Sequence, residues 1–440
     1  MNPLHDTIVS LSTALAIQAV SIIRLSGDRA LEITEQLLKK PLSNQDHRLT
    51  YGFVHEDEQI VDEVIVLVMK APRSYTREDV VEIQCHGGIY VTQKILSLVL
   101  GLGARLANNG EFTQRAVMNG RIDVSQAEAV NDLVNADSEQ SAQLAIQGLK
   151  GSIKQLIEPL KEELLAIIAH IEVNIDYPEY DLEEMTRKTL YPLCKNFEQK
   201  LMTLLEEAKS GITMRNGVKT AIVGKPNVGK SSLLNALLNE DKAIVTEIAG
   251  TTRDVVEGFI RLKNVSLHLL DTAGIRESED RIERLGIDKT YQMIEQAELV
   301  LFLVDAGLGM DTEEEELLKK IDPDKLMLIY NKKDLESKPD RLEISAMHRD
   351  IQSLVDAINE RYEVHQFVFK RPVLSTQRTV GLAMQALNAM RQALLSIEVE
   401  NEIDLINIDL REAYQALHAI GSLDDVSIQD EIFSRFCLGK

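Results

Sequence analysis

The spacing of hydrophobic and polar residues divides the chain into regions of different secondary structure. Between residues 1 and 118, strand-length apolar runs such as AVSIIRLSG and EVIVLVMKAP accompany a helical stretch, VTQKILSLVLGLGARLA, that ends near glycine. From 119 to 213, apolar residues such as Ile153 and Leu156 recur at three- and four-residue steps, which predicts helices. We expect Pro159 to start, kink or break one of these helices.

The pattern becomes alternating strand and helix between residues 214 and 372. AIVG, LVLFLVDA and KLMLIYN are continuous apolar runs, typical of parallel strands buried on both faces. VSLHLLD alternates more, which suits an edge strand paired antiparallel. Residues 373–440 are helical again, with TVGLAMQALNAMRQALLSI as the clearest amphipathic stretch. We therefore predict a multidomain α/β plus all-α fold. An α/β domain with a mostly parallel sheet is inserted in a helical domain built from both flanks.

Composition adds bounds on class and compartment. A chain of 440 residues is too long for one ordinary core, so we expect two or three domains. Three widely separated cysteines fit a reducing cytosol better than a disulfide framework. We see neither a signal peptide nor an apolar run long enough to cross a bilayer. The expectation is a cytoplasmic protein that does not contact a membrane.

The formal net charge of −22 weighs against a simple RNA-binding protein. Nucleic-acid binders usually carry a basic surface, because neutralising phosphates supplies much of their affinity. A chain this acidic would contact RNA only through a local basic patch or through a basic partner.

A phosphate-binding loop is predicted at GKPNVGKS, residues 224–231. The run follows the strand TAIV and opens the apolar helix SSLLNALL, which is the context that confirms such a motif. Its glycines let backbone amides face the phosphates at a helix N-terminus. Lys230 is expected to reach the β- and γ-phosphates and Ser231 to hold Mg²⁺.

Guanine is expected to be selected by NKKD, residues 331–334, at the end of a strand. A carboxylate at Asp334 accepts hydrogen bonds from the ring N–H and the exocyclic amine of guanine. Adenine would leave that carboxylate unpaired, and mismatches of this kind reject a ligand by roughly 10⁴-fold. Ser345 and Ala346, in LEISA, stand where a backbone amide would meet the guanine carbonyl oxygen.

The first switch segment would include EIAGTTRD, with Thr252 as a second Mg²⁺ ligand. Asp271, in DTAG, would hold the same ion through water. The expected GTP-binding residues are Asn227, Val228, Gly229, Lys230, Ser231, Ser232, Thr246, Glu247, Ile248, Ala249, Gly250, Thr251, Thr252, Asp271, Thr272, Ala273, Gly274, Asn331, Lys332, Asp334, Ser345 and Ala346.

These motifs together resemble one family. GKPNVGKS, GTTRD, DTAG followed by an aliphatic residue, and NKKD are shared by the Era-like bacterial GTPases. The outer segments DTIVSLST, IIRLSG, SYTREDVVEIQCHGG, GEFTQRA, SQAEAVNDLV, IDYPEYD and CLGK are similar to those of the MnmE (TrmE) family of tRNA modification GTPases. The resemblance covers nearly the whole chain.

The resemblance implies a domain arrangement and partners. It implies an N-terminal tetrahydrofolate-binding and dimerisation domain at 1–118, a helical domain at 119–213 and 373–440, and a G domain at 214–372. It also implies a homodimer that joins the flavin-dependent protein MnmG (GidA) in a heterotetramer. That complex adds an aminomethyl or carboxymethylaminomethyl group to carbon 5 of the wobble uridine of certain tRNAs, using a folate one-carbon unit. The RNA-binding partner would account for the acidity.

Two features of GTP hydrolysis follow from the same resemblance. Ile275, after DTAG, cannot orient water, and the family's catalytic glutamate aligns with Glu283, whose carboxylate would do so. Taken alone, Glu283 belongs to an acidic run that is usually a solvated face. The family binds K⁺ beside the phosphates, at positions that correspond to Asn227, Thr246, Ile248 and Thr251. Such a cation offsets charge that develops there. G-domain dimerisation would close the K⁺ site.

The family's folate positions correspond to Arg24, Glu82, Arg121 and Lys440. The ligand would be (6S)-5-formyl-tetrahydrofolate or another reduced folate. Surface ion pairs are the alternative for Glu82 and Arg121. The chain departs from the family pattern at ALAIQAVS, at Arg77 where glycine is usual, and at Arg121 where lysine is common.

The terminal CLGK run places Cys437 near the one-carbon group, where its thiol would either take part in the modification or line the site. Two other functions compete with this one. An Era-like ribosome-assembly GTPase would normally bring a basic RNA-binding domain, and no such flank is present. A membrane-remodelling GTPase would need a basic amphipathic helix or an apolar span.

Overall fold

The computed structural model describes residues 6–42, 48–136, 139–176, 183–238, 258–263, 265–270, 286–337, 340–362, 372–422 and 433. The chain divides into two compact units. The first comprises Met1–Val134, Gly148–Lys161 and Gln415–Lys440, and the second comprises Asn135–Gln147 and Glu162–Tyr414. The domain boundaries expected from the sequence stay predictions.

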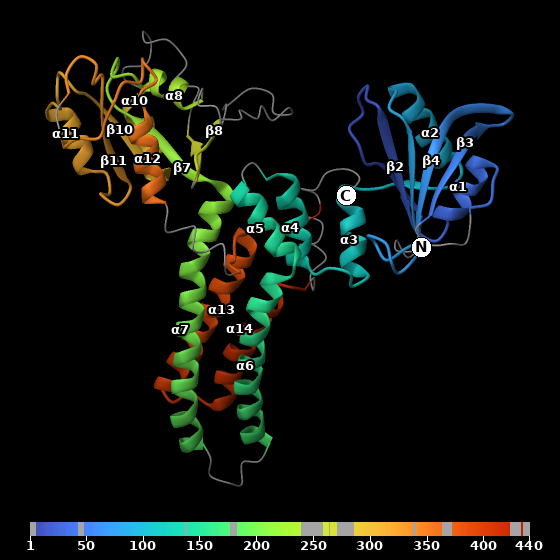
Figure 1. Cartoon of the computed structure of the whole chain (residues 1–440). Coiled ribbons are helices and arrows are strands. Elements are labelled where there is room, and N and C mark those ends of the chain that lie inside the picture. Colours follow the sequence, from blue (N-terminus) through green and yellow to red (C-terminus); the bar gives the residue numbers. More distant parts are fainter. Residues whose placement is uncertain are drawn as a thin grey trace. The chain divides into compact units, whose positions relative to one another are not determined.

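The first unit contains a six-stranded sheet with the strand order β3-β4-β5-β2-β1-β6 (Figure 1). All neighbouring strands are antiparallel except β1 and β6, which are parallel. The strands are β1 (Ile8–Leu11), β2 (Val20–Ser26), β3 (Arg48–Glu56), β4 (Gln59–Met69), β5 (Val80–His86) and β6 (Arg105–Leu106).

Two helices, α1 (Ala30–Leu38) and α2 (Ile89–Gly101), pack on one face of this sheet. Their apolar residues join one core with alternate strand residues such as Ile23 and Ile83, which are fully buried. The strands predicted from SIIRLS and EVIVLVM and the helix predicted from VTQKILSLVLG are confirmed. The remaining helices that lie wholly in this unit are α3 (Glu111–Met118) and α4 (Val124–Val134).

The second unit contains another six-stranded sheet, with the order β12-β11-β10-β7-β9-β8. Its strands are β7 (Val218–Val223), β8 (Gly258–Arg261), β9 (Ser266–Leu269), β10 (Leu299–Asp305), β11 (Leu326–Asn331) and β12 (Glu343–Ile344). Only β8 and β9 pair antiparallel. The prediction that VSLHLLD forms an edge strand is wrong. β9 pairs antiparallel with β8 but also parallel with β7, so β8 takes the edge.

Helices cover both faces of this second sheet. Along β10, Leu299, Leu301 and Leu303 enter one core, while Val300 and Phe302 enter the other. The first core includes α8 (Lys230–Leu238) and α12 (Gln352–Arg361), and the second includes α10 (Gly286–Gln296) and α11 (Thr312–Lys319). Burial on both faces is the reason for the continuous apolar run LVLFLV.

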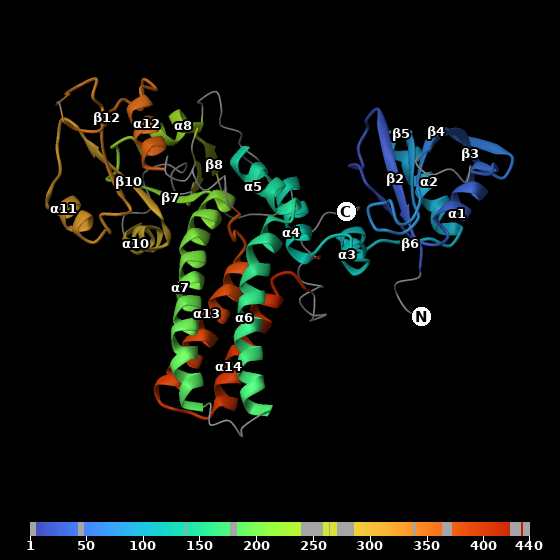
Figure 2. The same cartoon turned by 60° about the horizontal axis from the view of Figure 1, so that its bottom comes forward.

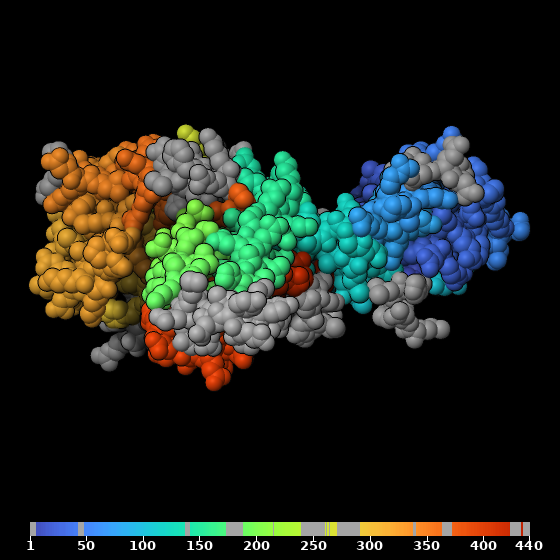
Figure 3. Space-filling model, turned by 90° about the horizontal axis from the view of Figure 1, so that it is seen from below, coloured from blue at the N-terminus to red at the C-terminus, as the bar shows by residue number. Residues whose placement is uncertain are grey.

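The helical part is built from segments far apart in the sequence: α5 (Glu139–Leu149), α6 (Ser152–Asp176), α7 (Glu183–Asn216), α13 (Gln377–Glu398) and α14 (Ile403–His418). Figures 1 and 2 show α6, α7, α13 and α14 side by side, and Figure 3 shows their green and red side chains next to each other. The prediction that Pro159 starts or breaks a helix is wrong. α6 continues through it from Ser152 to Asp176.

Paired contacts show that α7 and α13 run antiparallel. Tyr191 donates a hydrogen bond to Glu398 at 2.9 Å, and the buried carboxylate of Glu198 pairs with Arg391 at 3.0 Å. At the end of α7, a Cβ on Gly211 would lie only 2.5 Å from the carbonyl oxygen of Leu374. The chain therefore enters and leaves the α/β domain at one point, which confirms that this domain is inserted in the helical one.

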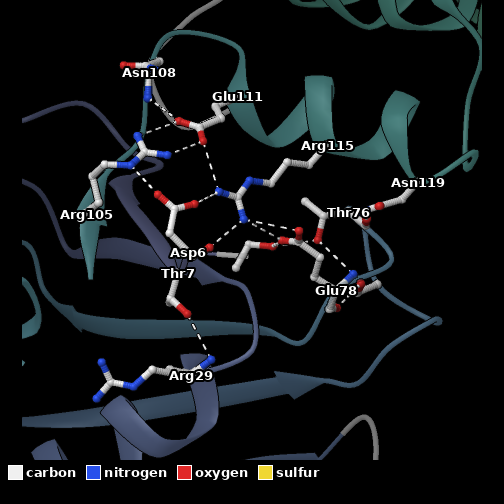
Figure 4. Close-up of polar contacts among 12 residues, drawn as sticks. Asp6, Thr7, Arg29, Thr76, Glu78, Arg105, Asn108, Glu111, Arg115 and Asn119 are labelled. Carbon is white, nitrogen blue, oxygen red and sulfur yellow. Dashed lines mark hydrogen bonds and ion pairs between the residues drawn. The ribbon is translucent and has the colours of Figure 1, made fainter. Parts of the chain in front are cut away.

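A buried arginine holds the first unit together beside its sheet. Arg115, on α3, is only 2% exposed, and it contacts the carboxylates of Asp6 at 2.5 Å and of Glu78 and Glu111 at 3.1 Å (Figure 4). Arg105, on β6, contacts Asp6 and Glu111 at 2.6 Å each. The network joins β6, α3 and the segments that precede β1 and β5.

Burial alone would raise the pKa of Asp6 and of Glu111. Hydrogen bonds from Arg105 and Arg115 to Asp6, and from Arg105 to Glu111, outweigh this effect, so both pKa values are lowered. A carboxyl whose pKa is lowered by folding stabilises the fold above its unfolded pKa, and that stability is lost as the pH falls through its folded pKa.

We predict that Arg115→Met destabilises the first unit by about 3–5 kcal/mol, because it leaves buried carboxylates without their cation. Hydrogen exchange of peptides from β1 and α3, followed by mass spectrometry on the intact chain, measures this local stability. Arg29→Met is the matched control, since Arg29 and its partner Glu32 are about half exposed, at 49% and 52%. Equal protection in the two variants would show that the network is dispensable.

Candidate functional site

The predicted GTP-binding residues of the described chain gather at the carboxyl ends of the parallel strands. Residues 224–231 follow β7, and the register pairs Asp305 of β10 with Asn331 of β11, and Asn331 with Ile344 of β12. These ends therefore lie level along one edge of the sheet. In open parallel sheets, ligands bind at this edge.

The backbone of the predicted phosphate loop takes the left-handed conformations that a tight phosphate cradle needs. Gly224, Asn227 and Gly229 have φ values of 152°, 64° and 100°. The Lys230 ammonium donates hydrogen bonds to the carbonyl oxygens of Gly224 and Lys225, each at 2.7 Å. The Lys230 ammonium therefore lies directly against the phosphate loop, where it was predicted to reach the phosphates.

Asn331 connects the phosphate loop to the predicted guanine loop. Its side chain is buried, and Nδ2 donates to the Val228 carbonyl at 2.7 Å while Oδ1 accepts from the Ala346 amide at 3.0 Å. A Cβ on Gly229 would lie 2.1 Å from Asn331 Nδ2, so only glycine leaves room for this bridge. The sequence predicted that Asn331 belongs to the guanine site, and the structure adds the bridge between the two loops.

Asp334 is positioned by the residue that follows β12. The Ser345 hydroxyl donates to Asp334 Oδ1 at 2.5 Å, and this bond lowers the pKa of the carboxyl. The His348 ring lies 3.7 Å from the other oxygen of Asp334. The carboxylate is therefore ionised at neutral pH, as an acceptor for two guanine N–H groups must be.

Lys332 lies between the two residues that were predicted to select guanine. It has a left-handed φ of 68°, and its ammonium donates to Asp305 Oδ2 at 2.7 Å. This hydrogen bond lowers the pKa of Asp305. Sequence reasoning missed Asp305, although its position directly after the buried run LVLFLV marked it as a residue at a strand end.

Metal binding at this edge would rest on oxygen atoms of the first turn of α8 and of the phosphate loop. Ser231 is exposed there, Ser232 is half-buried, and the Asn227 side chain is exposed. Hydroxyl and amide oxygens suit hard cations such as Mg²⁺ and K⁺. The side chains present therefore fit the predicted metals.

Several predicted site residues lie outside the described chain, and their roles stay predictions. They are Thr246, Glu247, Ile248, Ala249, Gly250, Thr251, Thr252, Asp271, Thr272, Ala273, Gly274, Glu283, Cys437 and Lys440.

Two of the predicted folate residues, Arg24 and Glu82, lie on the face of the first sheet opposite α1 and α2. Arg24 on β2 and Glu82 on β5 are direct cross-strand partners, and Arg24 Nε lies 2.8 Å from Glu82 Oε1. Their side chains are 23% and 14% exposed. The Arg24 guanidinium also lies 5.8 Å from the centre of the Phe112 ring. The two residues are therefore brought together as a polar pair at the edge of an aromatic group.

Arg121 lies beside the same apolar cluster. Its guanidinium carbon is 4.7 Å from the centre of the Tyr75 ring, and Tyr75 packs with Phe112, Ile8 and Ala107. Arg24 and Arg121 thus flank one cluster that contains two aromatic rings. Stacked guanidinium groups keep their N–H edges available for a carboxylate.

Arg77 shows why the family pattern has glycine at its position. Its φ is 59°, in the left-handed region that glycine adopts without strain, and its guanidinium donates to the Asn119 carbonyl at 2.9 Å. The backbone of this loop is therefore compatible with arginine, and the side chain joins it to the end of α3.

Comparison with known proteins matches nearly the whole chain to one family. A model described as GTP-binding protein TrmE N-terminus matches residues 7–121, and one described as MnmE helical domain matches residues 124–437. A Lactococcus lactis subsp. cremoris (strain MG1363) protein named tRNA modification GTPase MnmE is 44% identical over 448 residues, covering 99% of this chain and 98% of that protein. Proteins of the same name from Lactiplantibacillus plantarum and Bacillus mycoides are 43% and 42% identical, each again over 99% of this chain and over 98% and 99% of their own lengths.

Among solved structures, the GTPase Era in complex with a segment of 16S ribosomal RNA is 26% identical over 39% of this chain and 66% of that chain. The TM-score of this match is 0.26. No helix in the described ranges combines the length and the apolar character that a membrane crossing demands.

We predict that Gly229→Ala weakens binding of GTP and GDP by about tenfold or more, because the added Cβ displaces the buried Asn331 amide from Val228. Titration with a fluorescent guanine nucleotide measures the affinity. Gly309→Ala is the matched control: Gly309 also has a positive φ, 71°, but a Cβ there meets nothing within 4 Å. Equal affinities in the two variants would rule out the bridge as a requirement.

Proposed function

Because the chain belongs to the MnmE family of tRNA modification GTPases, we propose that it hydrolyses GTP within a complex that modifies carbon 5 of the wobble uridine of certain tRNAs. The proposal that the chain binds GTP is supported most directly by the Asn331 bridge. This bridge joins the phosphate loop to the loop with Ser345 and Ala346. This bridge places an ionised Asp334 at the same sheet edge as Lys230. GTP is the nucleotide that such an edge selects.

The described residues account for binding and selection. Backbone amides of the phosphate loop and Lys230 would hold the phosphates. Asp334 would accept hydrogen bonds from guanine, and adenine would leave it unpaired. Ser231 and Thr252 would hold Mg²⁺, and Asn227 with Thr246, Ile248 and Thr251 would hold K⁺. Bound cations supply positive charge beside the phosphates where negative charge develops. Glu283 would orient the attacking water.

We extend the proposal to a homodimer formed through the first sheet. Leu49, Tyr51 and Phe53 alternate along β3 and are 64%, 56% and 41% exposed, so they form an apolar stripe. In the sheet register Leu49 pairs with Leu67, and Leu67 pairs with Glu82, so the stripe and the Arg24–Glu82 pair share one face. A second copy that covered this stripe would lie next to the folate residues.

The remaining partners follow from charge and chemistry. With a net charge of −22, the chain would leave most tRNA phosphate contacts to a basic partner, and the flavin-dependent MnmG (GidA) is proposed for that place in a heterotetramer. A reduced folate, such as (6S)-5-formyl-tetrahydrofolate, would bind beside Arg24, Glu82 and Arg121 with the tail residue Lys440. Cys437 would act on or line the one-carbon end. We place this activity in the cytoplasm, where tRNA, GTP and reduced folates occur together.

The function is tested in cells that lack this chain. We predict that mass spectrometry of their tRNA shows wobble uridines without a substituent on carbon 5, and that the intact gene restores it. Normal modification in these cells would overturn the tRNA part of the proposal. It would leave an Era-like ribosome-assembly GTPase as the alternative, recognised by a defect in ribosomal subunits.

A second prediction concerns the cation. GTP turnover is expected to be several-fold faster in K⁺ than in Na⁺ at equal ionic strength, because K⁺ offsets charge at the phosphates. Asn227→Ala is expected to abolish this difference, since the exposed Asn227 side chain is the predicted K⁺ ligand of the phosphate loop. Equal rates in both salts for the unchanged protein would contradict a K⁺ site.

A further inference from the structure

A surface cavity of about 560 Å³ lies beside the proposed folate residue Arg121 and is lined by the connection from α3 to α4 and by the start of α6. Its apolar wall includes Val117 and Ile122, and its polar lining includes Arg121 and Lys154. All of its lining residues belong to the first unit. The volume falls in the range of sites for small ligands, roughly 300–1,000 Å³.

The acidic and amide groups of this cavity are already used within the protein. The Asp123 carboxylate accepts from the Ser125 hydroxyl at 2.6 Å and from the Gln126 amide at 2.8 Å. The Gln126 side chain donates to the Leu149 carbonyl at 2.9 Å and accepts from the Asp123 amide at 3.0 Å. These groups shape the wall and have little capacity left for a ligand.

Unlike the acidic and amide groups, the two cations of the cavity are not used in ion pairs within the described chain. In the described chain, Arg121 stacks on Tyr75 and pairs with no carboxylate, and Lys154 has no ion pair either. Both cations line the same cavity. The cavity therefore favours an anionic ligand that carries more than one charge.

The small number of cations in this cavity argues against RNA as its ligand. Proteins that bind RNA or DNA through phosphates gain affinity by neutralising several of them with Lys and Arg. This cavity offers two cations and one neighbouring carboxylate, Asp123. A small ligand with closely spaced carboxylates and short methylene stems fits the two cations and the apolar wall better.

We propose that this cavity binds the additional glutamates of a polyglutamylated reduced folate. The proposal rests on the folate site proposed above. Arg121 is shared by both: its guanidinium lies over Tyr75, in the cluster that Arg24 also borders, while the residue lines the cavity. Arg121 would hold the carboxylate of the first glutamate, and Lys154 would hold a carboxylate of a later one.

The test compares two forms of 5-formyl-tetrahydrofolate, with one glutamate and with three, by calorimetric titration of the full chain at low salt. An exposed ion pair changes an equilibrium constant by at most about fivefold. We therefore expect the triglutamate to bind up to about fivefold more tightly. The advantage is expected to shrink as salt is added, because salt screens exposed charges.

Variants assign the effect to the cavity. Lys154→Gln is expected to remove the advantage of the triglutamate and to leave the affinity for the monoglutamate unchanged. Arg121→Gln is expected to weaken both. Lys150→Gln is the matched control, because Lys150 is an exposed cation just before α6 that does not line the cavity.

The outcomes separate this inference from the folate proposal. If the unchanged protein binds both folates equally, the inference fails and the folate site stands. Should neither folate bind, both proposals fail. A Lys154→Gln variant that weakens both folates alike would assign Lys154 a structural effect and overturn the inference. The same holds if Lys154→Gln weakens binding of a short single-stranded RNA and leaves both folates unaffected, since that result would assign the cavity to phosphate.

Discussion

A polar group that is removed from water must find its hydrogen-bond partners inside the protein, and this constraint fixes both candidate sites. In the first unit the buried guanidinium of Arg115 requires the carboxylates of Asp6, Glu78 and Glu111. In the second unit the buried amide of Asn331 requires the Val228 carbonyl and the Ala346 amide. Each group connects segments that the sequence places far apart. Because a missing partner is costly, these contacts favour the arrangement that pairs them.

The two sites use this constraint differently. Asn331 lies within the proposed GTP site, so the residue that selects the ligand also joins the loops that hold it. Arg115 lies beside the proposed folate site and contacts none of its residues through a described bond. It fixes α3, and α3 carries Phe112 and leads to Arg121. Positioning is therefore direct in the nucleotide site and indirect in the folate site.

Charge distribution explains how an acidic chain retains anion-binding sites. Most described cations near the sites are paired within the protein, as Lys332 is with Asp305 and Arg24 is with Glu82. Lys230 is held by carbonyl oxygens, and Arg121 is stacked on an aromatic ring. Lys230 stands where phosphates are proposed to bind, and Arg121 stands where folate carboxylates are proposed to bind. In the described chain Arg121 pairs with no carboxylate that an anion would have to displace.

The sequence by itself determined what depends on local pattern. The continuous apolar run LVLFLV predicted a strand buried on both faces, and GKPNVGKS predicted a loop between a strand and a helix, because the required backbone conformations restrict the residue types. The resemblance to a family supplied Arg24, Glu82 and Arg121, which neither periodicity nor charge distinguishes from surface residues.

Only the tertiary structure decided which strand takes a sheet edge, that α6 continues through Pro159, and that Asp305 pairs with Lys332. It also decided that Arg121 and Lys154 line one cavity. These facts depend on contacts between residues distant in the chain. A local pattern restricts what each segment can form, but partner choice is set by which segments the packed cores bring together.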